Sequence, residues 1–129
     1  MDFGRDDTVR LERLLPTNRS LAREFRCSPS CPSTQDWARA EGAPAGALWM
    51  ADEQTAGRGR SARDWWTGPR GTNLAITLAV DPAPPPAPMC VVIAACALAH
   101  ALTERGAQAA AVKWPNDVLL GGAKVAGVI

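Results

Sequence analysis

The sequence predicts an α+β fold, with a mixed or antiparallel sheet backed by helices, on the basis of three observations. The 129 residues are 47% hydrophobic and 21% charged, as in one globular domain. Residues 72–80 alternate between large apolar and small or polar side chains, which is the period of a half-buried strand. The expected order is helix, strand, strand, helix, strand, strand, strand, without the strict βαβ alternation of a parallel sheet.

The first 32 residues are predicted to be an N-terminal extension, poorly ordered in part, that precedes a domain over 33–129. Short helices are favoured over 8–15 and 18–25, and the prolines within 27–32 favour a turn or a broken edge strand. Because the extension is too short for a winged-helix domain, we expect no DNA-binding domain in this chain.

A helix is predicted to begin at Ser33, since Ser33 and Asp36 have the spacing of an acidic capping box. Gly42 marks its end, and residues 47–52 favour a strand. The segment 54–71 contains four glycines and four arginines and forms a long connection.

The next strand, over 72–80, places its large apolar side chains on one face. Five prolines within 81–88 make a stiff connection, and the apolar residues 89–105 predict a buried helix that ends at Gly106. The apolar face of the strand consists of Leu74, Ile76, Leu78 and Val80.

The C-terminal part predicts a strand over 111–114 with a buried Trp114, and then a hairpin with strands 118–120 and 123–129. Gly121 and Gly122 supply the positive φ angles of a two-residue turn. The turn pairs Leu120 with Ala123, Leu119 with Lys124, Val118 with Val125 and Asp117 with Ala126, which places Asp117 and Lys124 on one face.

Asp117 and Lys124 form either a salt bridge or half of a functional site. Geometry alone favours the salt bridge. The composition favours the site, because the chain has 12 arginines and only two lysines, Lys113 and Lys124, both in this segment.

Several classes of protein are disfavoured by composition. A net charge of +1 gives no support for a general nucleic-acid or membrane-surface role. The longest apolar run stops at His100, short of a membrane span, and the N-terminus has no apolar signal region, so we expect a cytoplasmic protein. The cysteine spacings favour free buried thiols, and no metal site is expected.

The segment from Gln54 to Trp65 has the chemistry of an anion site. Its Gly-x-Gly run allows the backbone to approach a ligand, its three arginines attract negative charge, and Trp65 offers a flat face for a base. An exposed arginine- and glycine-rich loop is an equal alternative. The run from Ser33 to Gln35, taken alone, favours a simple helix cap. The alternative is a place where hydroxyl and N–H groups bind a polar ligand.

Together these motifs resemble the catalytic domain of biotin–protein ligases, the biotin–[acetyl-CoA-carboxylase] ligases, from residue 33 to the last residue. The resemblance rests on Ser33-Thr34, on Gln54-x-x-Gly-Arg-Gly-Arg-x-x-Arg-x-Trp65, on Lys113-Trp-Pro-Asn-Asp117 and on Lys124-x-x-Gly127. It implies a class II synthetase-like mixed sheet. It also implies ATP-dependent activation of biotin to biotinyl-5′-AMP, with Mg²⁺, and transfer to a lysine of a biotin carboxyl carrier protein.

The resemblance implies further properties. No membrane partner is expected, and a homodimer is compatible with the family. Catalytic domains of this family continue through further strands and helices beyond the position of Ile129. We therefore expect the domain to be incomplete at the C-terminus, and these residues alone to be poorly soluble and to transfer no biotin.

The resemblance also assigns roles to residues. Ser33, Thr34, Gln35 and Gln54 bind the ureido end of biotin. Gly57, Arg58, Gly59, Arg60 and Arg63 surround the carboxylate and phosphate, and Trp65 packs near the adenine. Lys124 contacts the carboxyl and phosphate region, Asn116 and Gly127 border the ligand, and Lys113 and Asp117 lie beside the reacting centre. The expected catalytic set is Arg60, Lys113, Asp117 and Lys124.

Two other functions stay open. Lipoate–protein ligases share a similar Lys-x-x-Asn-Asp and Lys element, but they carry an R-R-x-x-G-G-G loop that this sequence lacks. An inactive, truncated biotin-binding remnant is the second alternative. Pyrophosphate release that depends on both ATP and biotin would distinguish a biotin–protein ligase from these two alternatives.

Overall fold

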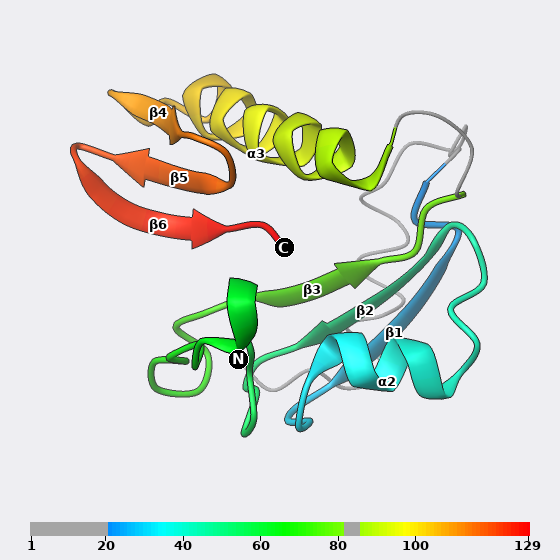
Figure 1. The fold of residues 1–129 in the computed structure, drawn as a ribbon. Helices are drawn as coiled ribbons and strands as arrows, with labels where there is room; N and C mark the ends of the chain where they lie inside the picture. The colour runs from blue at the N-terminus through cyan, green and yellow to red at the C-terminus, as the bar shows by residue number, and fades with distance from the viewer. Residues whose placement is uncertain (1–20, 82–85) are drawn as a thin grey trace. The chain divides into compact units, whose positions relative to one another are not determined.

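The computed structural model describes residues 21–81 and 86–129, which belong to two compact units. The described residues of the first unit are 21–81, and those of the second unit are 86–129 (Figure 1). The helix expected over 8–15 lies outside the described residues. Each unit contains one three-stranded sheet, in agreement with the predicted α+β class.

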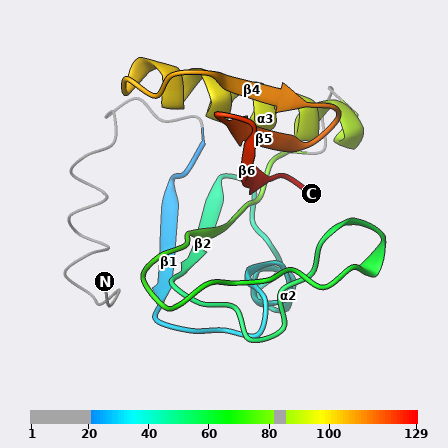
Figure 2. The ribbon, with the colours of Figure 1, turned by 90° about the vertical axis from the view of Figure 1, so that its left-hand side faces the viewer.

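The sheet of the first unit is mixed, with strand order β1-β2-β3. Strand β1 (Glu24–Ser28) runs parallel to β2 (Ala47–Ala51), and helix α2 (Thr34–Ala40) connects them. Strand β3 (Ala75–Leu78) pairs antiparallel with β2. Figure 2 shows β1 and β2 side by side. The crossover helix allows the two parallel strands to be neighbours.

Strand β1 corrects the prediction of a helix over 18–25. Glu24 and Phe25 are in the strand and pair with Ala47 and Leu48 of β2. Pairing with a largely buried strand outweighs the local helical pattern, because an unpaired edge beside β2 would leave main-chain groups without partners. Strand β1 lies within the stretch expected to be an extension.

Helix α2 begins as predicted. The Ser33 hydroxyl accepts a hydrogen bond from the Asp36 main-chain N–H at 3.5 Å, and Gly42 follows the helix with a φ of +76°. Its inner face packs on the sheet through a buried cluster of Ala38, Ala47 and Trp49. Small residues at these contacts allow the helix axis to approach the strands closely.

The alternation of β3 is confirmed, but the apolar face is not the one that packs in the first unit. Ala79 packs against the cluster around Trp49, and Thr77 donates to Thr34 at the start of α2. The large apolar side chains of the other face are 36 to 57% exposed, namely Leu74, Ile76, Leu78 and Val80. Packing of α2 therefore selects the face with small side chains.

A polar cluster joins the end of α2 to the sheet. The Glu41 carboxylate accepts hydrogen bonds from the indole N–H groups of Trp37 at 2.7 Å and Trp49 at 2.9 Å. It also pairs with the Arg26 guanidinium of β1 at 2.5 Å, and this guanidinium lies 5.4 Å from the Trp49 ring centroid. The hydrogen bond from Trp49 lowers the pKa of Glu41, partial burial opposes the shift, and Trp37 and Arg26 lower the pKa further.

Because the pKa of Glu41 is lowered by folding, this carboxylate stabilises the protein above the ordinary value of 4.5, and its contribution is lost as pH falls through the lower folded-state value. Glu41→Gln is expected to destabilise the protein at neutral pH, with the difference from wild type shrinking as the pH falls below 4.5. Urea unfolding followed by tryptophan fluorescence measures this. Glu104→Gln, at an exposed position, is the control, and a constant difference for Glu41→Gln across the pH range contradicts the account.

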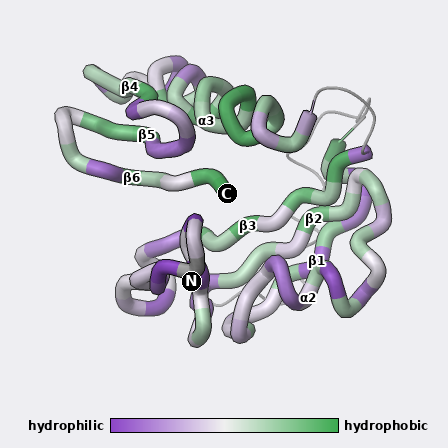
Figure 3. The backbone as a smooth tube through the Cα atoms, viewed as in Figure 1, coloured by the Kyte–Doolittle hydropathy of each residue, from purple (hydrophilic) through white to green (hydrophobic). Residues whose placement is uncertain are grey.

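The second unit consists of helix α3 (Ala87–Glu104) and an antiparallel sheet of β4 (Ala110–Lys113), β5 (Asp117–Leu120) and β6 (Ala123–Gly127). Its buried core is formed by Ala95 and Ala99 of the helix and by Val118 of the central strand β5. The hydropathy colouring of Figure 3 shows the apolar character of α3 and β5.

The prediction that α3 is a buried helix is wrong for most of its surface. Among the described residues, Met89, Ile93 and Leu98 are 37 to 51% exposed, because the sheet covers only the face that carries Ala95 and Ala99. The 18-residue helix is long and apolar enough to cross a membrane by length and composition alone, although its longest apolar run stops at His100 as the sequence predicts.

The hairpin of β5 and β6 has the predicted turn and a different register beyond it. Gly121 and Gly122 both have positive φ, and the pairs of Leu119 with Lys124 and of Leu120 with Ala123 are confirmed. A bulge then shifts the register, so that Val118 lies opposite Ala126 and Asp117 opposite Gly127. The predicted pairs with Val125 and Ala126 are wrong, because the bulge allows Ala126 to pack on the core around Val118.

Candidate functional site

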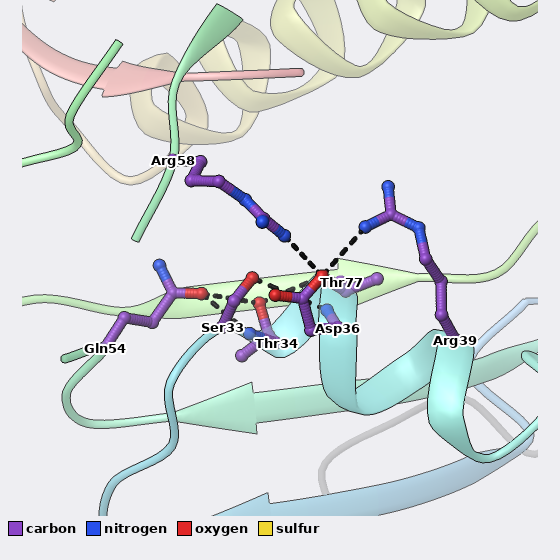
Figure 4. A network of polar contacts seen from close by, with 7 residues as sticks. All are labelled: Ser33, Thr34, Asp36, Arg39, Gln54, Arg58 and Thr77. Carbon is purple, nitrogen blue, oxygen red and sulfur yellow. Dashed lines mark hydrogen bonds and ion pairs between the residues drawn. The ribbon is translucent and has the colours of Figure 1, made fainter. Parts of the chain in front are cut away.

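The candidate site of the first unit is built around a short chain of hydrogen bonds at the start of α2 (Figure 4). Gln54 Oε1 accepts from the Thr34 main-chain N–H at 2.8 Å and from Thr34 Oγ1 at 3.0 Å. Thr34 Oγ1 in turn accepts from Thr77 Oγ1 of β3 at 2.9 Å. Ser33 and Thr34 are both 3% exposed. Three distant parts of the sequence thus join in one polar cluster.

Main-chain pairing brings Gln54 to this cluster. Cys31 and Gln54 form an isolated parallel bridge beyond the ends of β1 and β2. Three hydrogen bonds hold it: Cys31 N to Glu53 O at 3.1 Å, Thr55 N to Cys31 O at 3.0 Å, and Ala56 N to Pro32 O at 2.8 Å. The segments before α2 and after β2 therefore lie against one another, and Gln54 faces Thr34.

The glycine- and arginine-rich segment that follows forms a small hairpin. Arg58 and Asp64 form an antiparallel bridge, Trp65 N donates to Gly57 O at 3.1 Å, and Gly59 N donates to Arg63 O at 2.7 Å. A short 3-10 turn over Arg60–Ala62 closes it. The long connection predicted over 54–71 therefore contains a compact hairpin.

Gly57 is required by close approach within this hairpin. A Cβ atom at residue 57 would lie 3.0 Å from Gln54 Nε2 and 3.3 Å from the Trp65 carbonyl oxygen. The second contact involves main chain and is relieved only by moving the hairpin. A side chain at residue 57 would displace the Gln54 amide. The absence of a side chain at Gly57 therefore lets the hairpin pack against the polar cluster.

An ion pair connects the hairpin to α2. The Arg58 guanidinium donates a short hydrogen bond to Asp36 Oδ1, which also accepts from Arg39 at 3.0 Å (Figure 4). Two cations on one carboxylate hold Arg58 against the first turn of the helix. Arg58 thus has a protein partner in this structure, whereas the resemblance assigns it to the ligand.

The other predicted residues of this segment lie on the same hairpin. Arg60 and Arg63 are exposed, and Trp65 is half-buried with its ring edge 3.7 Å from the Cβ position of Gly59. Gln35, at the start of α2, is half-buried. The hairpin therefore presents two guanidinium-bearing side chains at its tip and an aromatic ring at its base.

The candidate residues of the second unit cluster around β5. Lys113 and Asp117 are directly paired across β4 and β5, and Lys124 Nζ lies 2.6 Å from Asp117 Oδ1. This confirms the expected salt bridge, although the bulge changes the pairing that produces it. Gly127 lies opposite Asp117, and the Asn116 carbonyl accepts from Val128 N at 2.8 Å.

The turn between β4 and β5 corrects the expectation of a buried tryptophan. Trp114 is 76% exposed and precedes a cis peptide bond to Pro115. The turn carries Trp114 away from the face on which Val112 and Val118 pack. The apolar ring therefore contributes little to the core of this unit.

The four cysteines are free thiols. Burial raises the pKa of the Cys31 thiol, whereas Cys96 is exposed, contrary to the expectation of buried thiols throughout. Within residues 21–81 and 86–129, no group of three or more His, Cys, Asp or Glu side chains has the arrangement of a metal site.

Two residues of the first-unit cluster were not predicted as site residues. Asp36 had been assigned only to the helix cap, and Thr77 only to a strand face. The alternation of residues 72–80 contains a signal for Thr77, since it is the polar residue between two alanines on the face opposite the large apolar side chains.

The mixed sheet, the polar cluster and the arginine hairpin make the first unit an α+β unit that carries the sequence motifs of residues 33–65. Residues 27–129 match the model of the Biotin/lipoate A/B protein ligase family, and the chain belongs to this family. The fold and the recognition predicted from the motifs are thereby confirmed.

Two relatives illustrate the similarity in sequence. The chain is 47% identical over 89 residues to a biotin–[acetyl-CoA-carboxylase] ligase of Paracoccus denitrificans, covering 65% of this chain and 36% of that protein. It is 37% identical over 89 residues to the bifunctional ligase/repressor BirA of Bacillus subtilis, covering 67% of this chain and 27% of that protein. The chain thus spans about a quarter to a third of the length of these relatives.

Solved structures show the same fold. A biotin protein ligase from Aquifex aeolicus, in complex with biotin and ATP, matches 83% of this chain and 46% of its own with a TM-score of 0.75 and 27% identity. A biotin acetyl coenzyme A carboxylase synthetase from Helicobacter pylori, with bound biotinylated ATP, matches 82% of this chain and 53% of its own with a TM-score of 0.72 and 29% identity.

Proposed function

We propose that the protein activates biotin with ATP to biotinyl-5′-AMP and transfers the biotinyl group to a lysine of a biotin carboxyl carrier protein. Family membership and the biotin- and ATP-bound neighbours support a ligase that uses these two substrates. A cytoplasmic location is part of this proposal, because the acyl-adenylate needs ATP and a carrier protein in the same compartment.

The observation that carries the proposal is the polarity of the Thr34 and Gln54 cluster. Gln54 Oε1 accepts two hydrogen bonds from Thr34, which leaves the amide nitrogen to donate elsewhere. The Thr34 hydroxyl oxygen keeps acceptor capacity. Acceptor and donor groups side by side complement a cyclic urea, which presents N–H groups beside a carbonyl. The dithiolane ring of lipoate has neither group.

In the first step, a biotin carboxylate oxygen attacks the α-phosphorus of ATP, the bond to the pyrophosphate oxygen breaks, and pyrophosphate leaves. Two anions must approach one another, so the protein's task is to supply fixed positive charge and orientation. We assign this task to Arg60 at the tip of the hairpin, assisted by Arg63, and to Lys124. Mg²⁺ enters with ATP as part of that substrate.

Arg58 has a different role in this proposal. Because Asp36 holds its guanidinium, Arg58 acts by keeping the hairpin against α2 and not by binding the phosphate. In the second step, the lysine amine of the carrier attacks the acyl carbon, an amide forms, and AMP leaves. We place Lys113 and Asp117 beside this reacting centre, Trp65 near the adenine, and Asn116 and Gly127 at the border of the ligand.

Direct binding tests the choice of substrate. Calorimetry on the purified full-length protein is expected to show binding of biotin and no binding of lipoate or octanoate. Binding of lipoate without biotin contradicts the proposal and favours the lipoate branch of the family.

A further inference from the structure

We infer that Thr77 is a positioning residue that fixes the direction of the hydrogen-bond chain from Thr77 through Thr34 to Gln54. It thereby sets the donor and acceptor pattern that meets the ureido group of the ligand. The inference rests on the proposed function, and none of the motifs that carry the resemblance includes Thr77. Its place in the chain follows from which groups can donate and which can accept.

The first constraint is the orientation of the Gln54 amide. A main-chain N–H can only donate, and that of Thr34 lies 2.8 Å from the Gln54 side chain. The atom facing it must therefore be the oxygen. Figure 4 shows this oxygen turned towards Thr34 and the amide nitrogen turned away. That nitrogen lies 3.0 Å from the Cβ position of Gly57, beside the hairpin.

The second constraint is the single hydrogen of the Thr34 hydroxyl. Gln54 Oε1 has a second lone pair, and Thr34 Oγ1 donates to it at 3.0 Å. With its hydrogen used, the Thr34 oxygen can only accept from Thr77, 2.9 Å away. The arrangement that satisfies both bonds to Oε1 therefore requires Thr77 as the donor.

Burial gives this arrangement its importance. Thr34 is 3% exposed, so water cannot readily replace the hydrogen bond from Thr77. Hydroxyl groups in a chain also polarise one another, and a hydroxyl that accepts a hydrogen bond donates a stronger one. Loss of the Thr77 hydroxyl is thus expected to loosen both the Thr34 hydroxyl and the Gln54 amide, although Thr77 is one hydrogen bond removed from Gln54.

The position in β3 permits a clean substitution. Thr77 pairs with Trp49 in the sheet, and valine has the same branched shape and strand preference without the hydroxyl. Thr77→Val therefore removes the donor with little change in packing. Thr77→Ser keeps the hydroxyl and loses one methyl group, and it is the matched control.

The experiment compares biotin binding, the KM for ATP and thermal melting of wild type, Thr77→Val and Thr77→Ser. Thr77→Val is expected to weaken biotin binding about 2- to 12-fold, the value of one hydrogen bond, with the KM for ATP unchanged. Thr77→Ser is expected to bind biotin as wild type does. If Thr77→Val does not fold, Thr77→Cys takes its place. Because a thiol is a weak donor, Thr77→Cys is expected to bind biotin more weakly than Thr77→Ser.

Wild-type affinity in Thr77→Val overturns the inference. Equal losses in Thr77→Ser and Thr77→Val also overturn it, because the methyl group and not the hydroxyl would then matter. A parallel loss in biotin affinity, ATP use and melting temperature indicates a structural role and counts against it. If the wild-type protein itself binds no biotin, the proposed function fails first, which is a distinguishable result.

Discussion

Replacement of Arg60 by alanine is expected to weaken retention of biotinyl-5′-AMP by about 10- to 150-fold, while biotin affinity changes little. A charge-assisted hydrogen bond contributes about 1.5–3 kcal/mol, and it is lost only where a phosphate is present. Arg60 lies in the turn that closes the hairpin, and it takes no part in the hydrogen bonds that join Thr34, Gln54 and Thr77. Dissociation of the adenylate and calorimetry with biotin measure the two effects separately.

Arg105→Ala is the matched control for Arg60→Ala. It removes the same charge from an exposed position after α3 and is expected to retain the adenylate normally. Equal losses in the two variants would indicate that net charge, and not the position of Arg60, determines retention. An equal loss of biotin and adenylate affinity in Arg60→Ala would place Arg60 at the ureido end.

The second large effect is expected at Lys124. Loss of a preorganised donor to developing charge costs about 10²- to 10³-fold in rate, and we expect such a loss of adenylate formation in Lys124→Ala. The ion pair with Asp117 is partly exposed, with side-chain exposures of 42% and 22%, so its loss should cost less than about 1 kcal/mol in unfolding free energy. Single-turnover rates and urea unfolding distinguish catalysis from stability.

Lys124→Arg tests why a chain rich in arginine retains lysine here. A planar guanidinium cannot replace a compact ammonium beside Asp117, and we expect Lys124→Arg to lose about tenfold or more in adenylate formation although the charge is kept. Wild-type activity in this variant would show that the choice of lysine has no functional basis.

The features of the fold that could be predicted are those determined locally. The start of α2 is specified by a hydrogen bond between Ser33 and Asp36, which are only three positions apart in the sequence. The turn at Gly121 and Gly122 is specified by the positive φ angles of these two residues themselves. Strand β1 could not be predicted, because residues 24 and 25 are strand only where β2 lies beside them. The bulge in β6 likewise depends on the fit of Ala126 to a core contributed by α3.

The candidate site also has a part that the sequence predicts and a part that it does not. The resemblance supplied Thr34, Gln54 and the arginines, because their order and spacing in the chain are specific. Asp36 and Arg58 are 22 residues apart and Thr34 and Thr77 are 43 apart, and these contacts exist only after the sheet has formed. A sequence pattern shows which types of residue occur at which spacing. The direction of a hydrogen-bond chain depends on atoms that only folding brings together.

ATP–pyrophosphate exchange tests the central claim, that the protein activates biotin at its carboxylate, most directly. With purified full-length protein and Mg-ATP, exchange of labelled pyrophosphate into ATP is expected when biotin is added, and neither lipoate nor octanoate should support it. Exchange that needs lipoate, or biotin binding without any exchange, would contradict the account.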